Sequence, residues 1–480
     1  MTDLQFLEQI IERKSEKILD ANDRIWEYAE LAYHETKSAA LLCGILEEEG
    51  FSVKTGCAGI PTCFTGTFSY GTGKPVMGIL GEYDALASLS QTAAFPEKAP
   101  LIPGGPGHGC GHSCLGTGAL AAALAVKEYL EAYKKDGTVI YFGCPAEEGA
   151  GAKQFMARAG MFDDVDFVYT WHPATENSVE ANHSNAIMGA NFIFDGVTAH
   201  AGGCPYLGRS ALDAAELMNV GCNYLREHMI PEARLHYAYI DAGGTAPNVV
   251  PDHAVIRYEV RSPWVAQVKD LFRRVVNVAR GAALMTETEM KYELSMAFTE
   301  YLPNNALAEI GDACLKEVGA PKWDEDDYAL ARKFLNTYNA QTIENIKNNI
   351  IEIYGEERLS EILERPLDSE IHPFDPAKLK QTAGSTDVGD VGYAAPTLNF
   401  QIATACIGNV GHTWQMTAQS CSPIAHKGLL TAAKVIALSC VRTMDQPEVI
   451  ERAKAEVRKR NGGRYTCPLP DEVLPPLETY

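Results

Sequence analysis

The chain has 480 residues, more than one ordinary hydrophobic core holds, so we expect two domains. Its formal net charge is −22, from 41 Lys and Arg against 63 Asp and Glu, and such a surface repels phosphate backbones and anionic lipid. We therefore expect neither nucleic-acid nor membrane binding. The charged N-terminal segment lacks the features of a signal peptide, which predicts a cytoplasmic protein with reduced thiols at its 13 cysteines.

The first part of the chain predicts an α/β domain. Apolar residues recur at helical spacing through the first 50 positions, which predicts helices there. A buried strand is expected over 76–80. A glycine-rich loop and a long helix follow this strand, and two further strands are expected at 139–142 and at 165–172. Strands that alternate with helices favour a mixed, largely parallel sheet flanked by helices.

From about residue 187 the order of the predicted elements changes. The segment 187–302 gives strand, helix, strand, strand, helix and strand, which is the ferredoxin-like βαββαβ unit. We therefore expect a discontinuous catalytic domain made of residues 1–186 and 303–480, with an inserted domain at 187–302. Helices are expected again near 328–365, in a segment whose role the sequence leaves open.

The run "GHGCGH" places Cys110 and His112 in the glycine-rich loop after the first strand. Thiolate and imidazole are good ligands for zinc-like ions, and two ligands one residue apart in an irregular loop can face one centre. The alternative is a tight turn in which both residues are incidental. A phosphate-binding loop is disfavoured, because no lysine follows the glycines.

The next two strand ends also carry chemically active residues. Glu147 and Glu148 follow one strand in "CPAEEG", where adjacent acids are often merely solvated, but two neighbouring carboxylates can also take different roles. One can bind metal while the other exchanges protons with water. His172 ends the following strand in "TWHP", where a core position is the alternative, and His412 lies far downstream in "VGHTWQ".

Taken together, these loops supply five candidate metal ligands: Cys110, His112, Glu148, His172 and His412. Five donors are more than one tetrahedral ion needs. They suit two ions that share a site, which is an arrangement that activates water for hydrolysis.

The inserted domain carries further polar candidates. His200 and Arg209 lie in "GVTAHAGGCPYLGRS", and Asn248 and Arg261 lie in "APNVVPDHAVIRYEVRS". From the residues alone, His200 could be a turn residue, and the arginines could simply pair with surface acids.

The order of these motifs resembles that of the binuclear metallopeptidases, a family of aminoacylases, bacterial carboxypeptidases and amino-acid-conjugate amidohydrolases. The resemblance rests on "GEYDAL" (81–86), "GHGCGH" (107–112), "PAEEG" (145–149), "HP" (172–173), "TAHAG" (198–202), "GRSALDA" (208–214), "PNVVPD" (247–252), "STDVGDV" (385–391) and "GHTWQ" (411–415). It implies that the five candidates are the metal ligands and that Glu147 is the general base. Many relatives have His-x-Asp where this chain has Glu82-Tyr83-Asp84, so only Asp84 is carried over, as an orienting residue.

For the inserted domain, the resemblance implies a lid that also forms a dimer. His200 then stabilises the oxyanion, often across the dimer. Asn248 and Arg261 hold the carboxylate of the substrate, and Arg209 is a weaker candidate for the same role.

The resulting prediction is a two-metal amidohydrolase that cleaves an N-acyl or N-aroyl amino acid or a dipeptide. Its cofactors are two divalent ions per chain, Zn or Mn, with Co also compatible with these ligands. We expect a homodimer through the inserted domain or a pair with a paralogous subunit. The alternatives are a dipeptidase or carboxypeptidase of the same family, and a metal-binding accessory subunit without turnover.

Overall fold

The computed structural model describes residues 1–478. Its α-helices are α1 (Asp3–Tyr28), α2 (Thr36–Glu48), α3 (His112–Tyr133), α4 (Lys153–Arg158), α5 (Ala211–Leu225), α6 (Val265–Thr286), α7 (Asn305–Val318), α8 (Glu325–Leu335), α9 (Ala340–Tyr354), α10 (Leu359–Glu364), α11 (Val388–Ala394), α12 (Trp414–Gln419), α13 (Pro423–Met444) and α14 (Pro447–Asn461). Its strands are β1 (Ser52–Thr55), β2 (Phe64–Tyr70), β3 (Val76–Glu82), β4 (Gly137–Cys144), β5 (Phe167–Ala174), β6 (Ser178–Val179), β7 (Ala186–Asp195), β8 (Arg234–Asp241), β9 (His253–Ser262), β10 (Glu289–Phe298) and β11 (Thr397–Ala403).

Seven strands form the first sheet, in the order β1-β2-β4-β3-β5-β11-β6. The four central strands β4, β3, β5 and β11 are parallel, whereas β1, β2 and β6 are antiparallel to their neighbours. Every residue of β3 is buried, as expected for a parallel strand covered on both faces. The prediction of a mixed, largely parallel sheet flanked by helices is confirmed.

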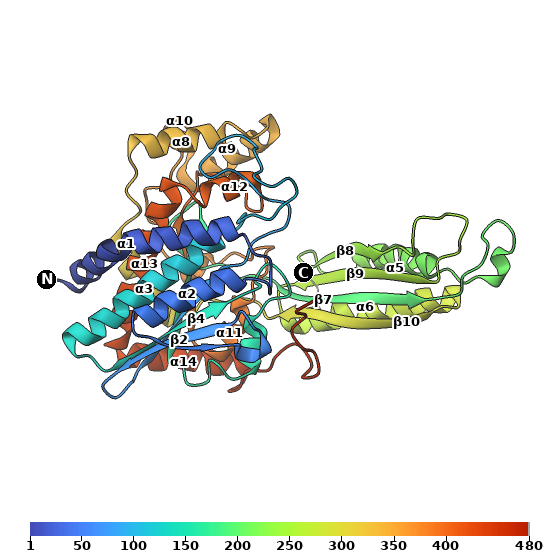
Figure 1. The fold of residues 1–480 in the computed structure, drawn as a ribbon, viewed down its shortest axis with the longest axis horizontal. Coiled ribbons are helices and arrows are strands. Elements are labelled where there is room, and N and C mark those ends of the chain that lie inside the picture. Colours follow the sequence, from blue (N-terminus) through green and yellow to red (C-terminus); the bar gives the residue numbers. More distant parts are fainter. Residues whose placement is uncertain (479–480) are drawn as a thin grey trace.

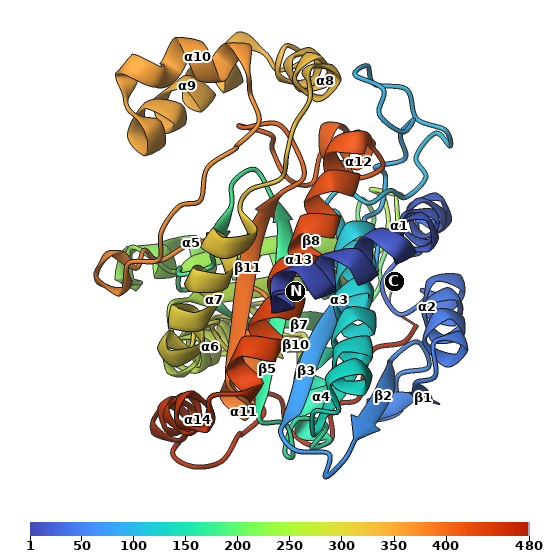
Figure 2. The ribbon, with the colours of Figure 1, turned by 90° about the vertical axis from the view of Figure 1, so that its left-hand side faces the viewer.

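Three long helices cover one face of this sheet. Figure 2 shows α1, α3 and α13 in front of β3, β5 and β11, with the inserted domain on the far side. Helix α3 is rich in alanine and almost entirely buried between its neighbours, so the backbones approach closely. Within the described residues, α13 is also long and apolar enough to meet the length and composition criteria for a membrane span, but 72% of that window is buried inside the protein.

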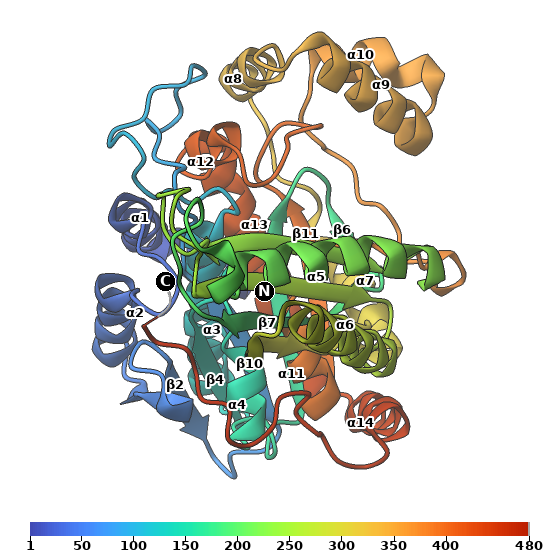
Figure 3. The ribbon, with the colours of Figure 1, turned by 90° about the vertical axis from the view of Figure 1, so that its right-hand side faces the viewer.

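The second sheet is antiparallel and has the strand order β10-β7-β9-β8. With α5 and α6 it forms the predicted βαββαβ unit, and Figure 3 shows both helices in front of the first sheet. Residues of β9 alternate between buried and partly exposed, because one face of the sheet packs on the two helices. The sheet is interposed between β6 and α7, so it interrupts the first domain in sequence. The domain boundaries at 187 and 302 remain a prediction.

The second sheet extends away from the first (Figure 1). At its base, the backbone N–H of Asn185 donates to the carbonyl oxygen of Gly384, 2.7 Å away. From there β7 runs for ten residues to Asp195, which corresponds to about 30 Å along the strand. The loops after β7 and before β9 therefore lie at the tip of the inserted domain, remote from the first sheet.

Candidate metal centre

The strand ends of the first sheet bring several predicted ligands together. Glu82 ends β3, Glu147 and Glu148 follow β4, and His172 lies near the end of β5. Since these strands are parallel neighbours, their carboxyl ends meet at one edge, where open α/β sheets place their sites. His112 is the first residue of α3, and this brings the predicted "GHGCGH" loop to the same edge.

The five candidate ligands form two groups that share one residue. The first group is Cys110, His112 and His172, and the second is Cys110, Glu148 and His412. Within each group the ligand atoms lie within 4.8 Å of one another. Sγ of Cys110 lies 3.5 Å from Nε2 of His172, and Nε2 of His412 lies 3.3 Å from Oε1 of Glu148. The two groups thus offer two candidate cation positions that share the thiol of Cys110.

Hydrogen bonds orient both histidines of the first group. Nδ1 of His112 donates to Oδ1 of Asp84 at 2.8 Å, and Nδ1 of His172 donates to the carbonyl oxygen of Pro173 at 2.8 Å. Each ring therefore presents Nε2 to the centre, as metal-binding histidines do. Nε2 of His112 is buried and makes no hydrogen bond within residues 1–478, although Oε2 of Glu82 lies 3.2 Å away. These residues fit a divalent cation.

The glycines of the first loop allow this close approach. A Cβ on Gly109 would lie 2.4 Å from Cδ1 of Leu89 and 3.5 Å from Cα of His412. The backbone N–H of His412 donates to the carbonyl oxygen of Gly109, so the loop and the distant ligand are held together. His412 and Ala146 have φ values of 58° and 61°, a strained conformation that is frequent at functional sites.

The two adjacent glutamates lie in different electrostatic environments. Burial and the negative charges of Glu82 and Glu148 raise the pKa of Glu147 well above its usual value. Burial also acts on Glu148, but the hydrogen bond from His412 and the charge of His112 outweigh it and lower its pKa to about 2. One carboxyl is thus suited to carry a proton and the other to remain an anion.

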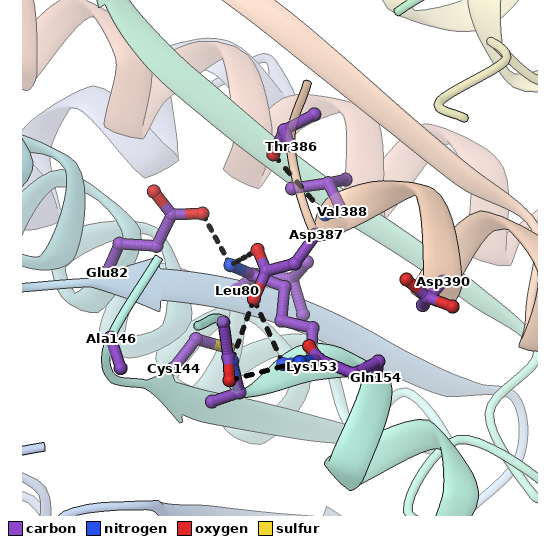
Figure 4. Close-up of polar contacts among 12 residues, drawn as sticks. Leu80, Glu82, Cys144, Ala146, Lys153, Gln154, Thr386, Asp387, Val388 and Asp390 are labelled. Carbon is purple, nitrogen blue, oxygen red and sulfur yellow. Dashed lines mark hydrogen bonds and ion pairs between the residues drawn. The ribbon is translucent and has the colours of Figure 1, made fainter. Parts of the chain in front are cut away.

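Sequence reasoning missed a buried lysine side chain beside this centre. Nζ of Lys153, at the start of α4, lies 2.7 Å from Oε1 of Glu82 and 2.5 Å from Oδ1 of Asp387 (Figure 4). All three side chains are almost fully buried. The other oxygen of Asp387 accepts hydrogen bonds from the backbone N–H groups of Ala152 and Lys153. The available signals were the acid at the end of β3 and the aspartate of "STDVGDV", but nothing in the sequence linked them to a lysine.

A cavity of about 420 Å³ lies over the candidate ligands. Cys110, Glu147 and His172 line it on one side, and Arg261 enters it from the base of β9. A terminal nitrogen of Arg261 lies 3.2 Å from Glu259, and its Nε has no hydrogen-bond partner among the described residues. Of the polar candidates in the inserted domain, Arg261 is therefore placed at the centre of the same chain.

The other three candidates of the inserted domain lie at its tip. His200 and Asn248 are exposed in the two loops there, which pair through the bridge between His200 and Val249. Nδ1 of His200 accepts hydrogen bonds from the backbone N–H groups of Gly202 and Gly203, which leaves Nε2 directed elsewhere. Arg209 pairs with Glu287 at 2.7 Å. The structure does not bring these residues to the metal centre of their own chain.

Comparison with known proteins identifies the family. The model of Peptidase family M20/M25/M40 matches residues 78–365, which is more than half of the chain. The chain belongs to this family. The predicted resemblance is thereby confirmed, and so is the predicted enzyme class, a hydrolase that acts on amide bonds.

Individual relatives match this M20 family chain over nearly its full length. One p-aminobenzoyl-glutamate hydrolase subunit of Escherichia coli (strain K12) is 40% identical, with 98% of both chains covered. The Xaa-Arg dipeptidase of Mus musculus is 27% identical, with 98% of this chain and 95% of the relative covered. The crystal structure of an aminobenzoyl-glutamate utilization protein from Klebsiella pneumoniae superposes with a TM-score of 0.55 at 18% identity, with 90% of this chain and 98% of that chain covered, and so shares the fold.

Proposed function

We propose that this protein is a two-metal amidohydrolase that cleaves N-acyl or N-aroyl amino acids, with p-aminobenzoyl-glutamate as the reference substrate. The observation that carries the proposal is the pair of ligand groups that share Cys110. The substrate class is suggested by the Escherichia coli relative, which is 40% identical over 98% of both chains.

Two divalent ions would fit these groups, which share Cys110. Cys110, His112 and His172 would hold one ion, and Glu148 and His412 would complete the second position. Thiolate, imidazole and carboxylate together accept Zn, Mn or Co. When bound, such ions polarise an amide carbonyl and make water more acidic.

The chain's own residues supply the remaining chemistry. Glu147 lines the cavity and offers a carboxylate oxygen within 4.8 Å of the ligand atom of His112, so it would take the proton from the attacking water and deliver it to the leaving amine. Asp84 holds His112 through Nδ1 and also accepts a hydrogen bond from the backbone N–H of Glu148, and it thereby orients both ligands.

The inserted domain would serve a second chain. His200 and Asn248 lie at the tip, about 30 Å along β7 from its base, so they act on the centre of a partner subunit in a dimer. His200 would hold the oxyanion and Asn248 the substrate carboxylate. Arg261 binds the carboxylate from the chain's own side. Arg209, paired with Glu287, would hold the loop that carries His200.

Dipeptidase activity is the second candidate, because the match with the Xaa-Arg dipeptidase of Mus musculus covers 95% of that relative. The candidate metal centre suits hydrolysis of the amide bond of an N-acyl amino acid as well as that of a dipeptide. The Escherichia coli relative is named as one subunit of its hydrolase, so the partner could also be a paralogous chain in place of a second copy.

The test combines metal analysis with an activity assay. We expect about two ions per chain by elemental analysis. We also expect release of the amine from p-aminobenzoyl-glutamate or from a panel of N-acyl amino acids and dipeptides, lost on chelation and restored by Zn or Mn. Activity that survives complete removal of metal would contradict the proposal.

A further inference from the structure

The cavity extends beyond the metal centre toward the edge of the first sheet. In the register of β5 and β11, Gln401 lies opposite His172, and in the register of β11 and β6, Ser178 lies opposite Gln401. Glu180 follows β6 directly. Two strand spacings, about 10 Å, thus separate His172 from this edge of the sheet. His172 and Glu180 both line the same cavity.

Glu180 is held at the cavity wall by neutral donors. Its Oε2 accepts a hydrogen bond from Nε2 of Gln401 at 2.6 Å, and its Oε1 accepts one from the backbone N–H of Asn182 at 2.8 Å. Neither donor carries a charge that would offset the charge of the carboxylate. Each carboxylate oxygen can also accept a further hydrogen bond.

A second acceptor lies on the same wall. Asn399 lines the cavity, and its Oδ1 is buried and has no hydrogen-bond partner in the described part of the chain. The backbone N–H of Glu180 donates to the carbonyl oxygen of Asn399, so the two residues are direct neighbours. A buried amide oxygen without a partner is costly, and a ligand that donates an N–H would satisfy it.

We propose that Glu180 and Asn399 form a subsite for an N–H-donating group of the substrate, a primary amine or a guanidinium. The inference rests on the proposed function, because it requires the substrate to occupy this cavity. It adds that the cavity recognises two groups, a carboxylate at Arg261 and an N–H-donating amine or guanidinium at Glu180. A substrate with a carboxylate at this end would be repelled.

The amine can belong to either half of the substrate. On the acyl side it would be the amino group of an aminobenzoyl ring, and on the amino-acid side it would be the side chain of lysine, ornithine or arginine. Both sources donate N–H groups to Glu180, although only the side chains carry a positive charge, and a site built to pair with such a donor discriminates against an analogue that lacks it.

The experiment compares Glu180→Gln with the wild-type protein on two substrate pairs. The first pair is p-aminobenzoyl-glutamate and benzoyl-glutamate, and the second is benzoyl-lysine and benzoyl-norleucine. The readout is the ratio of kcat/KM within each pair. Glu176→Gln, four residues earlier and outside the cavity lining, is the control with the same loss of charge.

We expect Glu180→Gln to lower the preference for the amine-bearing member at least tenfold in one pair, and that pair identifies the half of the substrate concerned. Glu176→Gln should leave both ratios unchanged. If Glu180 only fastens β6 to β11, Glu180→Gln lowers kcat/KM equally for both members of each pair, and the proposal is overturned. Unchanged ratios in both pairs overturn it as well.

A binding measurement separates this proposal from the proposed function. If the wild-type protein hydrolyses none of the four substrates, saturation-transfer NMR compares p-aminobenzoate with benzoate and lysine with norleucine. Stronger binding of the amine-bearing probe that Glu180→Gln abolishes would support the subsite while the proposed function fails. Equal binding of both members of each pair would overturn the subsite.

Discussion

The candidate metal centre is assembled from residues of one chain, whereas the tip of the inserted domain lies remote from the metal centre of its own chain. At the centre, loops from neighbouring strand ends bring the ligand atoms of each group within 4.8 Å of one another, and hydrogen bonds to Asp84 and Pro173 orient the histidines. At the tip, His200 and Asn248 are exposed in loops about 30 Å along β7 from the base of the inserted domain. The candidate metal-binding half of the site is therefore assembled within one chain, and we propose that the other half serves a second chain.

This contrast implies that substitutions in the two regions have different effects. Changes at the centre should alter metal content or chemistry in every subunit on its own. Changes at the tip should leave the centre of the same chain intact and impair a neighbour. Substitutions in the two regions can therefore be told apart by metal content and by mixing chains.

The largest effect is expected from Glu147→Gln. Because it removes the proposed proton acceptor and no proposed ligand, kcat should fall by about 10³-fold or more while close to two ions stay bound. Glu148→Gln is the matched control, since it removes a ligand and should lower the metal content. Kinetics and elemental analysis on the same samples check both variants. Substantial activity in Glu147→Gln would exclude the assigned role.

A smaller but still large effect is expected from Lys153→Met on stability. The substitution leaves the buried carboxylates of Glu82 and Asp387 without their cation, which should lower the free energy of unfolding by about 3–5 kcal/mol. Lys316→Met breaks an exposed pair with Asp312 and should cost less than about 1 kcal/mol. Denaturant unfolding of the metal-free proteins gives both values. Equal losses of unfolding free energy in the two variants would show that burial does not increase the contribution of the Lys153 ion pairs to stability.

The fold class could be predicted from the sequence because hydrophobic patterns mark the strands β3, β4 and β5 and all four strands of the second sheet, whereas β1, β2, β6 and β11 were not among the predicted strands. The grouping of the candidate ligands followed from a related pattern, since parallel strands bring their carboxyl ends to one edge. Lys153 was not predictable: it begins an ordinary short helix, and its partner Asp387 comes from a distant segment. Glu180 was missed likewise, because its place in the cavity depends on β6 pairing with β11.

The position of His200 shows another limit of sequence reasoning. The resemblance carried by "TAHAG" implied a role at the oxyanion, but the length and direction of β7 place His200 remote from the candidate metal centre of its own chain. Only the arrangement of the two sheets in space supplies that information.

The smallest of the three effects is expected from His200→Ala, at about 10²-fold in kcat, the usual cost of losing one donor to an oxyanion. Metal content should not change, because His200 lies remote from the ligands. This pattern alone would not show which chain's centre the histidine serves.

Mixing two inactive variants answers that question. In a mixed dimer of Glu147→Gln and His200→Ala chains, one site combines an intact Glu147 with the partner's intact His200. Random exchange of a one-to-one mixture makes half of the dimers mixed, with one working site each, so about a quarter of the wild-type activity should return. If His200 served its own chain, every site in the mixture would lack one residue and no activity would return. Because neither variant alters a ligand, recovery would show that the two halves of the site belong to different chains.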